Sequence, residues 1–481
     1  MILSLWLREN PKSVPKLLML IGFLPFALSP FHLYMAAVSW PDWPGYVKGA
    51  EFSVLDAVAL ALYCSLRDPR RPLPFRISVV LYFAAVLLSV FQASVPIAAV
   101  FYAWQIARMF LIYAAVARAC SSPDCAPALL KGMAAGLVMQ AGVGLWQRLG
   151  LGILQVDATA GHQNLLGLTT HFAAFPIFAL LMAGQRGWVP SVGTLASVAI
   201  QALTTSRATV GLAAFGYFAV FALSAAQRWT SRTTLVLLIG IVTVGAITPV
   251  LLASFERRFA IEGVSDYDER GAFQKAASMM ISDHPFGIGA NHYVVVANVG
   301  GYNTTAGVAP IFGSLSANVH NVYLLVAAET GYFGLMTFVF VLLAPLIVAF
   351  RCGFRNRGDE RGTMLIGLGV ALMVVYLHSF FEWIFVSFQA QYLWALDVGL
   401  VAGLAQQLGY WRRTEDTHAS LFRGIRSRVD GVLTYHAARN SSAPLRYGSR
   451  PRSMITTTAA DSASKALIIR PNTDGNGTGS G

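Results

Sequence analysis

Three basic residues lie next to long apolar segments, where they could take part in chemistry. Arg207 stands in a turn between two apolar segments, Arg270 lies early in a polar insertion, and His320 lies where that insertion meets the next apolar segment. Guanidinium groups bind phosphate oxygens in a bidentate way, and a neutral imidazole can accept a proton from a hydroxyl group. The three residues therefore predict a site for an anionic, lipid-linked substrate. The structural alternatives are a histidine bonded to a backbone carbonyl and arginines paired with headgroups or acidic side chains.

Further polar residues are candidates for substrate binding. His162 and Asn164 precede another apolar segment, where they could contact sugars or cap a helix. Asn321 could likewise be a helix cap or a hydrogen-bond donor to the substrate. Lys275 adds a cation within the polar insertion.

Two glutamates interrupt apolar segments, namely Glu329 and Glu382. A carboxylate at membrane depth is unfavourable, so such residues indicate either a function or a role in holding helices together. Glu329 follows His320 in the same segment and could orient it indirectly, contact the substrate or pair with a buried arginine. Glu382 lies beside Trp383, near the predicted outer end of its segment.

The composition is typical of an integral membrane protein. Of the 481 residues, 56% are hydrophobic and 12% are charged, whereas soluble domains carry about 25% charged residues. The net charge of +12 does not require nucleic acid as a partner, because Lys and Arg accumulate in the cytoplasmic loops of membrane proteins and are attracted to anionic lipid. We therefore expect a membrane and no nucleic acid as partner.

The hydropathy pattern predicts an all-α integral membrane protein with about twelve transmembrane helices and a helical outer subdomain. Arg and Lys concentrate in alternate connecting segments, which predicts that both termini are cytoplasmic and the long polar insertion is outside. The predicted regions are an N-terminal bundle of about nine spans (1–253), the outer segment (254–320), the C-terminal spans (321–407) and a basic, partly disordered cytoplasmic tail (408–481). The spans are predicted near residues 17–38, 51–66, 75–94, 97–117, 130–148, 165–183, 188–204, 207–225, 234–253, 321–350, 363–384 and 389–407.

The outer segment is predicted to contain a helix that starts at 265–268. Apolar residues then recur at helical spacing and give the helix one apolar face, which is expected to lie on the bundle or at the lipid interface. These residues are Phe273, Ala276, Ala277, Met280 and Ile281. Residues 284–289 are predicted to end the helix, and 298–318, rich in Gly, Asn, Thr and Ser, to form a mobile loop. In the tail, 420–438 could be a basic amphipathic helix.

Several signatures of other enzyme classes are absent from the sequence. It contains no Gly-x-x-x-x-Gly-Lys phosphate loop, no cluster of Asp or His with metal-ligand spacing and no Gly-x-Ser-x-Gly motif. We therefore expect no nucleotide, no bound metal ion and no other cofactor.

The order and spacing of the polar motifs resemble the O-antigen ligase and O-antigen polymerase superfamily of polytopic, lipid-linked-glycan transferases. The similarity covers about residues 160–350. The motifs are Ser206-Arg207, Arg270 followed by 272–281, Asp-His-Pro-Phe-Gly-Ile-Gly at 283–289, His-Asn-Val-Tyr-Leu at 320–324 and Glu-Thr-Gly-Tyr-Phe-Gly at 329–334. Residues 161–164 resemble the family's Asn-containing stretch, but have His-Gln where many members have Asn-Pro.

The resemblance implies a metal-independent, inverting glycosyltransferase of the bacterial inner membrane, with a periplasmic outer subdomain. Such an enzyme transfers a glycan from undecaprenyl diphosphate to an acceptor hydroxyl at the periplasmic face. By this resemblance Arg207 and Arg270 would hold the diphosphate, and His320 would act as base or position the acceptor. The acceptor would be lipid A–core in a ligase, another lipid-linked glycan in an O-antigen or exopolysaccharide polymerase, or a protein. We favour ligase-type chemistry. A lipid-linked-sugar transporter or flippase is the alternative from another class, although no inverted repeat is visible.

Overall fold

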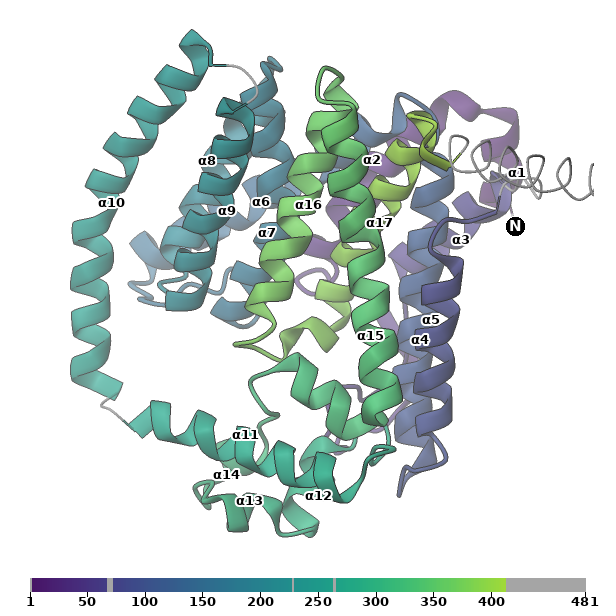
Figure 1. Cartoon of the computed structure of the whole chain (residues 1–481), viewed down its shortest axis with the longest axis vertical. Coiled ribbons are helices and arrows are strands. Elements are labelled where there is room, and N and C mark those ends of the chain that lie inside the picture. The colour runs from purple at the N-terminus through teal and green to yellow at the C-terminus, as the bar shows by residue number, and fades with distance from the viewer. Residues whose placement is uncertain (1, 67–71, 227–228, 263–264, 412–481) are drawn as a thin grey trace, which may run out of the picture. The chain divides into compact units, whose positions relative to one another are not determined.

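The computed structural model describes residues 2–66, 72–226, 229–262 and 265–411. Its regular elements are helices apart from one two-stranded sheet (Figure 1). In chain order they are α1 (Ile2–Glu9), η1 (Pro11–Ser13), α2 (Val14–Ala27), β1 (Tyr34–Ser39), β2 (Gly49–Ser53), α3 (Val54–Ser65), α4 (Arg76–Ser89), α5 (Pro96–Ala119), α6 (Cys125–Gly150), α7 (Gln163–Ala183), α8 (Trp188–Leu203), α9 (Arg207–Ala225), α10 (Ser231–Glu262), α11 (Ser265–Asp283), α12 (Tyr293–Val299), α13 (Tyr302–Ala306), α14 (Phe312–Leu315), α15 (Val322–Arg355), α16 (Glu360–His378), η2 (Ile384–Val386) and α17 (Phe388–Gln407). The amphipathic helix predicted at 420–438 lies outside the described residues.

Six of the described helices are long and apolar enough to cross a membrane: α5, α6, α7, α9, α15 and α16. Shorter apolar helices accompany them, namely α3, α4, α8 and the first part of α10 (Ser231–Ala246). The chain is therefore a largely α-helical, multi-pass membrane protein, as its sequence predicts. The spans predicted from residue 51 onward each overlap one of the helices α3–α10 or α15–α17. The number of crossings, the sidedness and the four-region division of the chain stay predictions.

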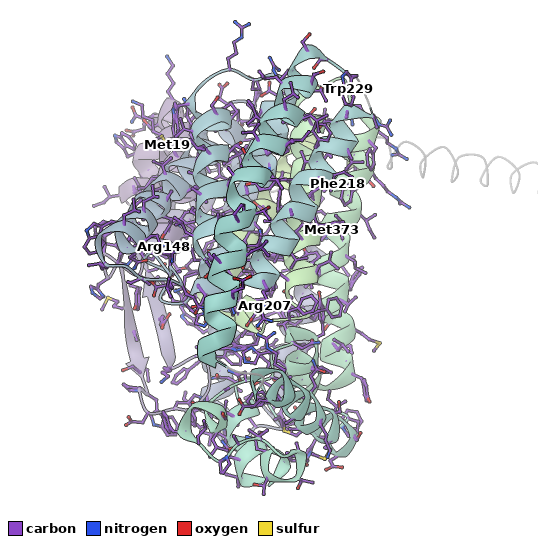
Figure 2. All side chains as sticks on the ribbon, turned by 90° about the vertical axis from the view of Figure 1, so that its left-hand side faces the viewer. Met19, Arg148, Arg207, Phe218, Trp229 and Met373 are labelled. Carbon is purple, nitrogen blue, oxygen red and sulfur yellow. The ribbon has the colours of Figure 1, made fainter. Side chains whose placement is uncertain are left out.

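The first predicted span is wrong in its second half. The span expected over 17–38 ends at Ala27, and Tyr34–Ser39 instead form strand β1. Pro30 follows the end of α2, and a proline disfavours helical geometry in the residue before it. Strand β1 pairs antiparallel with β2 in a hairpin (Figure 2). Apolar composition alone does not distinguish this strand from the helix before it, because apolar side chains occur in both kinds of element.

The polar insertion folds into the helices α11–α14, which lie at one end of the bundle (Figure 1). Helix α11 runs over Ser265–Asp283, so its predicted start and end are confirmed. The prediction of a loop over 298–318 is wrong in part, because α13 and α14 lie within it.

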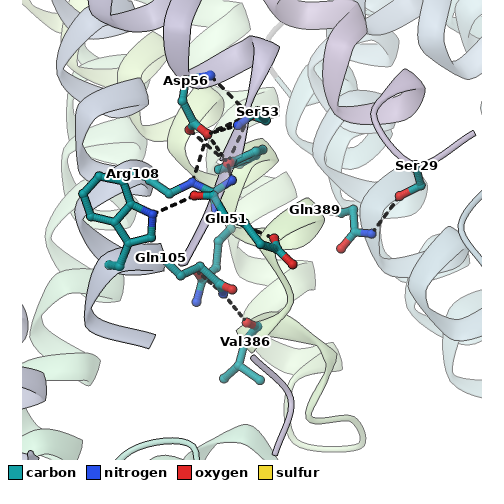
Figure 3. Close-up of polar contacts among 11 residues, drawn as sticks. Ser29, Glu51, Ser53, Asp56, Gln105, Arg108, Val386 and Gln389 are labelled. Carbon is teal, nitrogen blue, oxygen red and sulfur yellow. Dashed lines mark hydrogen bonds and ion pairs between the residues drawn. The ribbon is translucent and has the colours of Figure 1, made fainter. Parts of the chain in front are cut away.

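A buried arginine in α5 ties together elements that are distant in the sequence (Figure 3). Nε of Arg108 lies 2.9 Å from Oδ2 of Asp56 in α3, and its Nη1 lies 3.7 Å from Oε2 of Glu51 in β2. Tyr392 of α17 donates its hydroxyl to Oδ1 of Asp56 at 2.9 Å. Removing one partner of a buried ion pair costs about 3–5 kcal/mol, so this cluster fixes the hairpin and three helices relative to one another.

Helix α15 is interrupted at Gly331, which has φ 69° and ψ −174°. The backbone after α11 packs directly against this break. A β-carbon on Gly331 would lie 2.5 Å from the carbonyl carbon of Phe286 and 2.6 Å from the carbonyl oxygen of Pro285, and Tyr332 N donates to that oxygen at 3.1 Å. The break therefore joins the C-terminal end of α11 to α15.

Replacing Gly331 with alanine is expected to lower the stability of the protein by about 1–3 kcal/mol, because alanine strongly disfavours this backbone conformation and would collide with the 285–286 backbone. The thermal unfolding midpoint of the purified protein measures the effect. Gly313→Ala is the matched control, since a β-carbon there would have no heavy atom within 4 Å. Equal midpoints for the two variants would contradict the prediction.

Candidate functional site

The carboxylate of Glu382 joins three of the residues that the sequence singles out. Asn164 Nδ2 donates to Oε1 of Glu382 at 2.7 Å, Arg270 Nη2 donates to the same oxygen at 3.3 Å, and His320 Nδ1 lies 3.2 Å from Oε2. Glu382 is 2% exposed, whereas the side chains of His320 and Arg270 are 27% and 44% exposed. These four residues, called the Glu382 cluster below, thus combine a buried anion with an imidazole and a guanidinium that a ligand can reach.

His320 reaches Glu382 because the beginning of α15 is bonded to the end of α16. Val322 N, at the start of α15, donates to the carbonyl oxygen of Ser379 at 3.0 Å. Asn321 is the N-cap of α15. Its Oδ1 accepts hydrogen bonds from the backbone N–H groups of Tyr323 and Leu324, at 3.0 and 3.2 Å. The side-chain oxygen of Asn321 is therefore used as a cap, and substrate binding by this residue stays a prediction.

Arg270 is positioned by the apolar face of α11. Phe273 and Met280 are 3% and 0% exposed, which confirms the helical spacing predicted from the sequence. Because this face is buried against the rest of the protein, Arg270 lies beside the loop after α16. There its Nη1 donates to the carbonyl oxygen of Phe381 at 3.5 Å. The Phe273 and His320 rings are 6.0 Å apart between centroids, so α11 contributes both a cation and an aromatic contact to the cluster.

His162 and Asn164 occupy the N-terminus of α7. Nδ1 of His162 accepts from Asn164 N at 3.2 Å, so His162 is the N-cap of this helix. Of the two roles considered for this stretch, capping is therefore observed for His162. The side chain of Asn164 is directed at Glu382, and His162 lies within electrostatic range of both Glu382 and His320.

The environment of Glu382 favours its ionised form. Burial alone would raise the pKa of this carboxyl group, but the hydrogen bond with His320 and the charges of His320 and Arg270 outweigh burial and lower the pKa below its ordinary value. The anion in turn accepts the imidazole N–H and the guanidinium N–H, which holds both donors in place. Among the described residues, no group of three or more His, Cys, Asp or Glu side chains is arranged to hold a metal ion.

Glu382 is expected to stabilise the fold only while it is ionised. Its pKa in the folded protein lies below the ordinary value of 4.5, so its stabilisation is present above that pH and is lost as the pH falls through the lower, folded-state pKa. Glu382→Gln should therefore lower the thermal midpoint at neutral pH, and the difference from the wild type should shrink in acid. Glu360→Gln, at the exposed end of α16, is the control. A difference that stays constant across the titration would contradict the prediction.

Comparison with protein families gives one match. Residues 192–339 match the family described as O-Antigen ligase. The resemblance to the O-antigen ligase superfamily is confirmed over this segment. No curated protein matches the chain. The matched segment, residues 192–339, contains Arg270 and His320, whereas Asn164 and Glu382 lie outside it. The Glu382 cluster is thus assembled from the matched segment and from residues on either side of it: Asn164 in α7 before it, and Glu382 in the loop after α16.

Glu329 also lies within the matched segment but makes other contacts. It is 2% exposed, its Oε1 accepts from the backbone N–H groups of 292–293 at 2.9 and 3.0 Å, and its Oε2 accepts from the Tyr46 hydroxyl at 2.5 Å. These bonds fasten the start of α12 and the segment before β2 to α15. The carboxylate that contacts His320 is therefore Glu382. The sequence marks Glu382 as a carboxylate in an apolar segment but does not assign it to the site.

Two cations of the matched segment that the sequence singles out, Arg207 and Lys275, are not among the three residues bonded to Glu382. Arg207 is the first residue of α9, and its side chain is exposed (Figure 2). It follows Ser206, the N-cap, whose hydroxyl accepts from Thr209 N at 3.4 Å. Lys275 lies on the exposed face of α11. Phosphate binding by Arg207 and substrate binding by Lys275 stay predictions.

Proposed function

We propose that this membrane protein is an O-antigen ligase-type glycosyltransferase of the bacterial inner membrane, with both termini in the cytoplasm and α11–α14 in the periplasm. It moves a glycan from undecaprenyl diphosphate to an acceptor hydroxyl at the periplasmic face. The observation that carries this proposal is the Glu382 cluster, in which one buried carboxylate holds a proton acceptor beside a guanidinium. The match to the O-Antigen ligase family supports the same chemistry.

His320 is the proposed base. Because its Nδ1 faces Glu382 Oε2, the tautomer that donates from Nδ1 leaves a lone pair on Nε2. The acceptor O–H bond breaks and its proton moves to Nε2, while the acceptor oxygen bonds to the anomeric carbon on the face opposite the diphosphate. The bond from that carbon to the diphosphate breaks, and its electron pair leaves with the phosphate oxygen. The configuration is inverted, and the energy comes from the diphosphate linkage.

Arg270 and Arg207 are proposed to hold the diphosphate. Arg270 donates weakly to Glu382 and Phe381, and its exposed N–H groups are available for phosphate oxygens. Arg207 begins a helix, where the helix dipole also favours an anion. These fixed cations stabilise the negative charge that develops on the leaving group, so the reaction is proposed to be independent of a metal ion. Lys275 would bind an outlying phosphate or headgroup.

Arg270→Lys is expected to lower kcat/KM for the lipid-linked donor by about 10- to 100-fold, since lysine cannot reproduce a charged two-point contact. The KM for the donor should rise. Arg361→Lys is the matched control, because Arg361 also makes a two-point contact, with Asp359, but lies at the predicted cytoplasmic end of α16. An Arg270→Lys variant with wild-type kinetics would identify a structural arginine.

The proposal is tested with purified protein, an undecaprenyl-diphosphate glycan and each candidate acceptor: lipid A–core, a second lipid-linked glycan and a protein. A single shift of one acceptor by the whole glycan indicates ligation, and a ladder of chain lengths indicates a polymerase. Movement of the intact donor across a vesicle membrane without transfer would instead support a flippase.

A further inference from the structure

A second polar group lies deeper in the bundle than the Glu382 cluster. It consists of His171 in α7, Gln201 in α8, Thr209 in α9 and His378 at the end of α16, and is called the inner polar group below. The four side chains are 0%, 3%, 0% and 0% exposed, in that order. Helix α7 packs against α8, α9 and α16 (Figure 1), so the group lies where four helices meet.

His171, His378 and Gln201 lie close together, and Thr209 lies against the preceding turn of α7. The His171 and His378 rings are 5.3 Å apart between centroids, and Gln201 Nε2 lies 3.5 Å from His171 Nδ1. The Thr209 hydroxyl faces Gly167, one turn before His171, so closely that a β-carbon on Gly167 would come within 2.2 Å of it. His171 itself lies about two turns, or ~10 Å, along α7 from Asn164.

Five polar atoms of this group have no hydrogen-bond partner among the described residues: His171 Nε2, Gln201 Oε1, Thr209 Oγ1 and both ring nitrogens of His378. Buried polar atoms are nearly always hydrogen-bonded, because leaving them unpaired away from water is unfavourable. Five such atoms at one helix junction are therefore better explained by a shared occupant than by independent defects. The occupant must both donate and accept hydrogen bonds and be small enough for a site with almost no exposure.

We propose that the inner polar group binds ordered internal water, and that this water makes His378 a positioning residue for Glu382. Water suits the group because each buried water needs two to four polar partners. The carbonyl oxygen of His378 accepts from Phe381 N at 2.9 Å, so the backbone of His378 is bonded directly to the loop that carries Phe381 and Glu382, the two partners of Arg270. His378 also lies within electrostatic range of Glu382. The positioning role depends on the transferase activity proposed above, whereas the water site does not.

Radiolytic labelling tests the water site directly, since hydroxyl radicals formed from bound water oxidise adjacent side chains. We expect oxidation of His171 and His378 in the folded protein despite their burial. Met133, which is also 0% exposed but lies in the apolar core, is the reference and should remain unmodified. Absence of oxidation at both histidines would overturn the proposal.

Thr209→Val supplies a second, independent test. If Thr209 bonds to water, the variant loses that bond and its thermal midpoint should fall. If the site is dry, removal of an unpaired hydroxyl should raise the midpoint, which would overturn the proposal. Thr170→Val is the matched control, because Thr170 is equally buried but donates to the carbonyl oxygen of Leu166 at 2.7 Å.

His378→Leu and His378→Gln test the positioning role. The leucine variant should lower kcat by about tenfold or more, with the KM for the acceptor unchanged, because displacement of a catalytic group is costly even without lost contacts. Glutamine, which can still bond to water, should restore most of the rate. Wild-type kcat in the leucine variant, or equal losses in both, would overturn the role. If the wild type shows no transfer with any acceptor, the proposed function fails, while labelling and unfolding still decide the water site.

Discussion

Replacing His320 with alanine is expected to abolish detectable glycan transfer, with kcat falling by about 10²–10⁴-fold, the usual contribution of a general base. The variant has no group at this position to accept the proton of the attacking hydroxyl. Its fold should persist, because the His320 side chain is 27% exposed and the N-cap of α15 is the neighbouring Asn321. Transfer from a purified undecaprenyl-diphosphate glycan gives the rate, and thermal unfolding checks the fold.

His284→Ala is the matched control for this experiment. His284 belongs to the same polar insertion and follows the C-terminal end of α11, but its side chain is exposed and lies outside the Glu382 cluster. It should keep the wild-type rate. Full activity of His320→Ala would remove the base from the proposed mechanism, and equal losses in the two histidine variants would indicate general damage to the insertion.

Glu382→Gln should have the second largest effect, a fall in kcat of about 100-fold or more. A neutral amide cannot stabilise the imidazolium that forms when His320 takes up a proton, and its NH₂ group allows other imidazole tautomers. The KM for the donor should also rise, because Arg270 loses its charged partner. Steady-state kinetics at neutral pH separate the two effects, and the folded fraction of the variant is measured under the same conditions.

Glu382→Asp and Glu360→Gln complete this experiment. The aspartate keeps the charge on a shorter side chain and should recover part of the activity, whereas Glu360→Gln removes an exposed carboxylate at the other end of α16 and should have no effect. A glutamine variant of Glu382 that transfers glycan at the wild-type rate would show that the carboxylate holds the helices together without supporting the chemistry.

The sequence alone determined most of the long apolar helices and most of the candidate residues. Apolar runs long enough to cross a membrane predicted α5–α7 within a few residues, and the start of α11 and its buried face followed from residue spacing. The polar motifs around Arg207, Arg270 and His320 were sufficient for the resemblance that the family match confirms. These features are local, because helical periodicity and capping depend on residues only a few positions apart.

Only the tertiary structure decided which carboxylate forms a hydrogen bond with His320. Glu329 lies nearer in the sequence, but its oxygens are bonded to 292–293 and Tyr46. Glu382, which is 62 residues from His320 and 218 from Asn164, makes the contacts instead. Periodicity describes the faces of one helix and says nothing about which distant element packs on them. A carboxylate accepts few hydrogen bonds, and the packing of α7, α11, α15 and α16 determines which donors reach it.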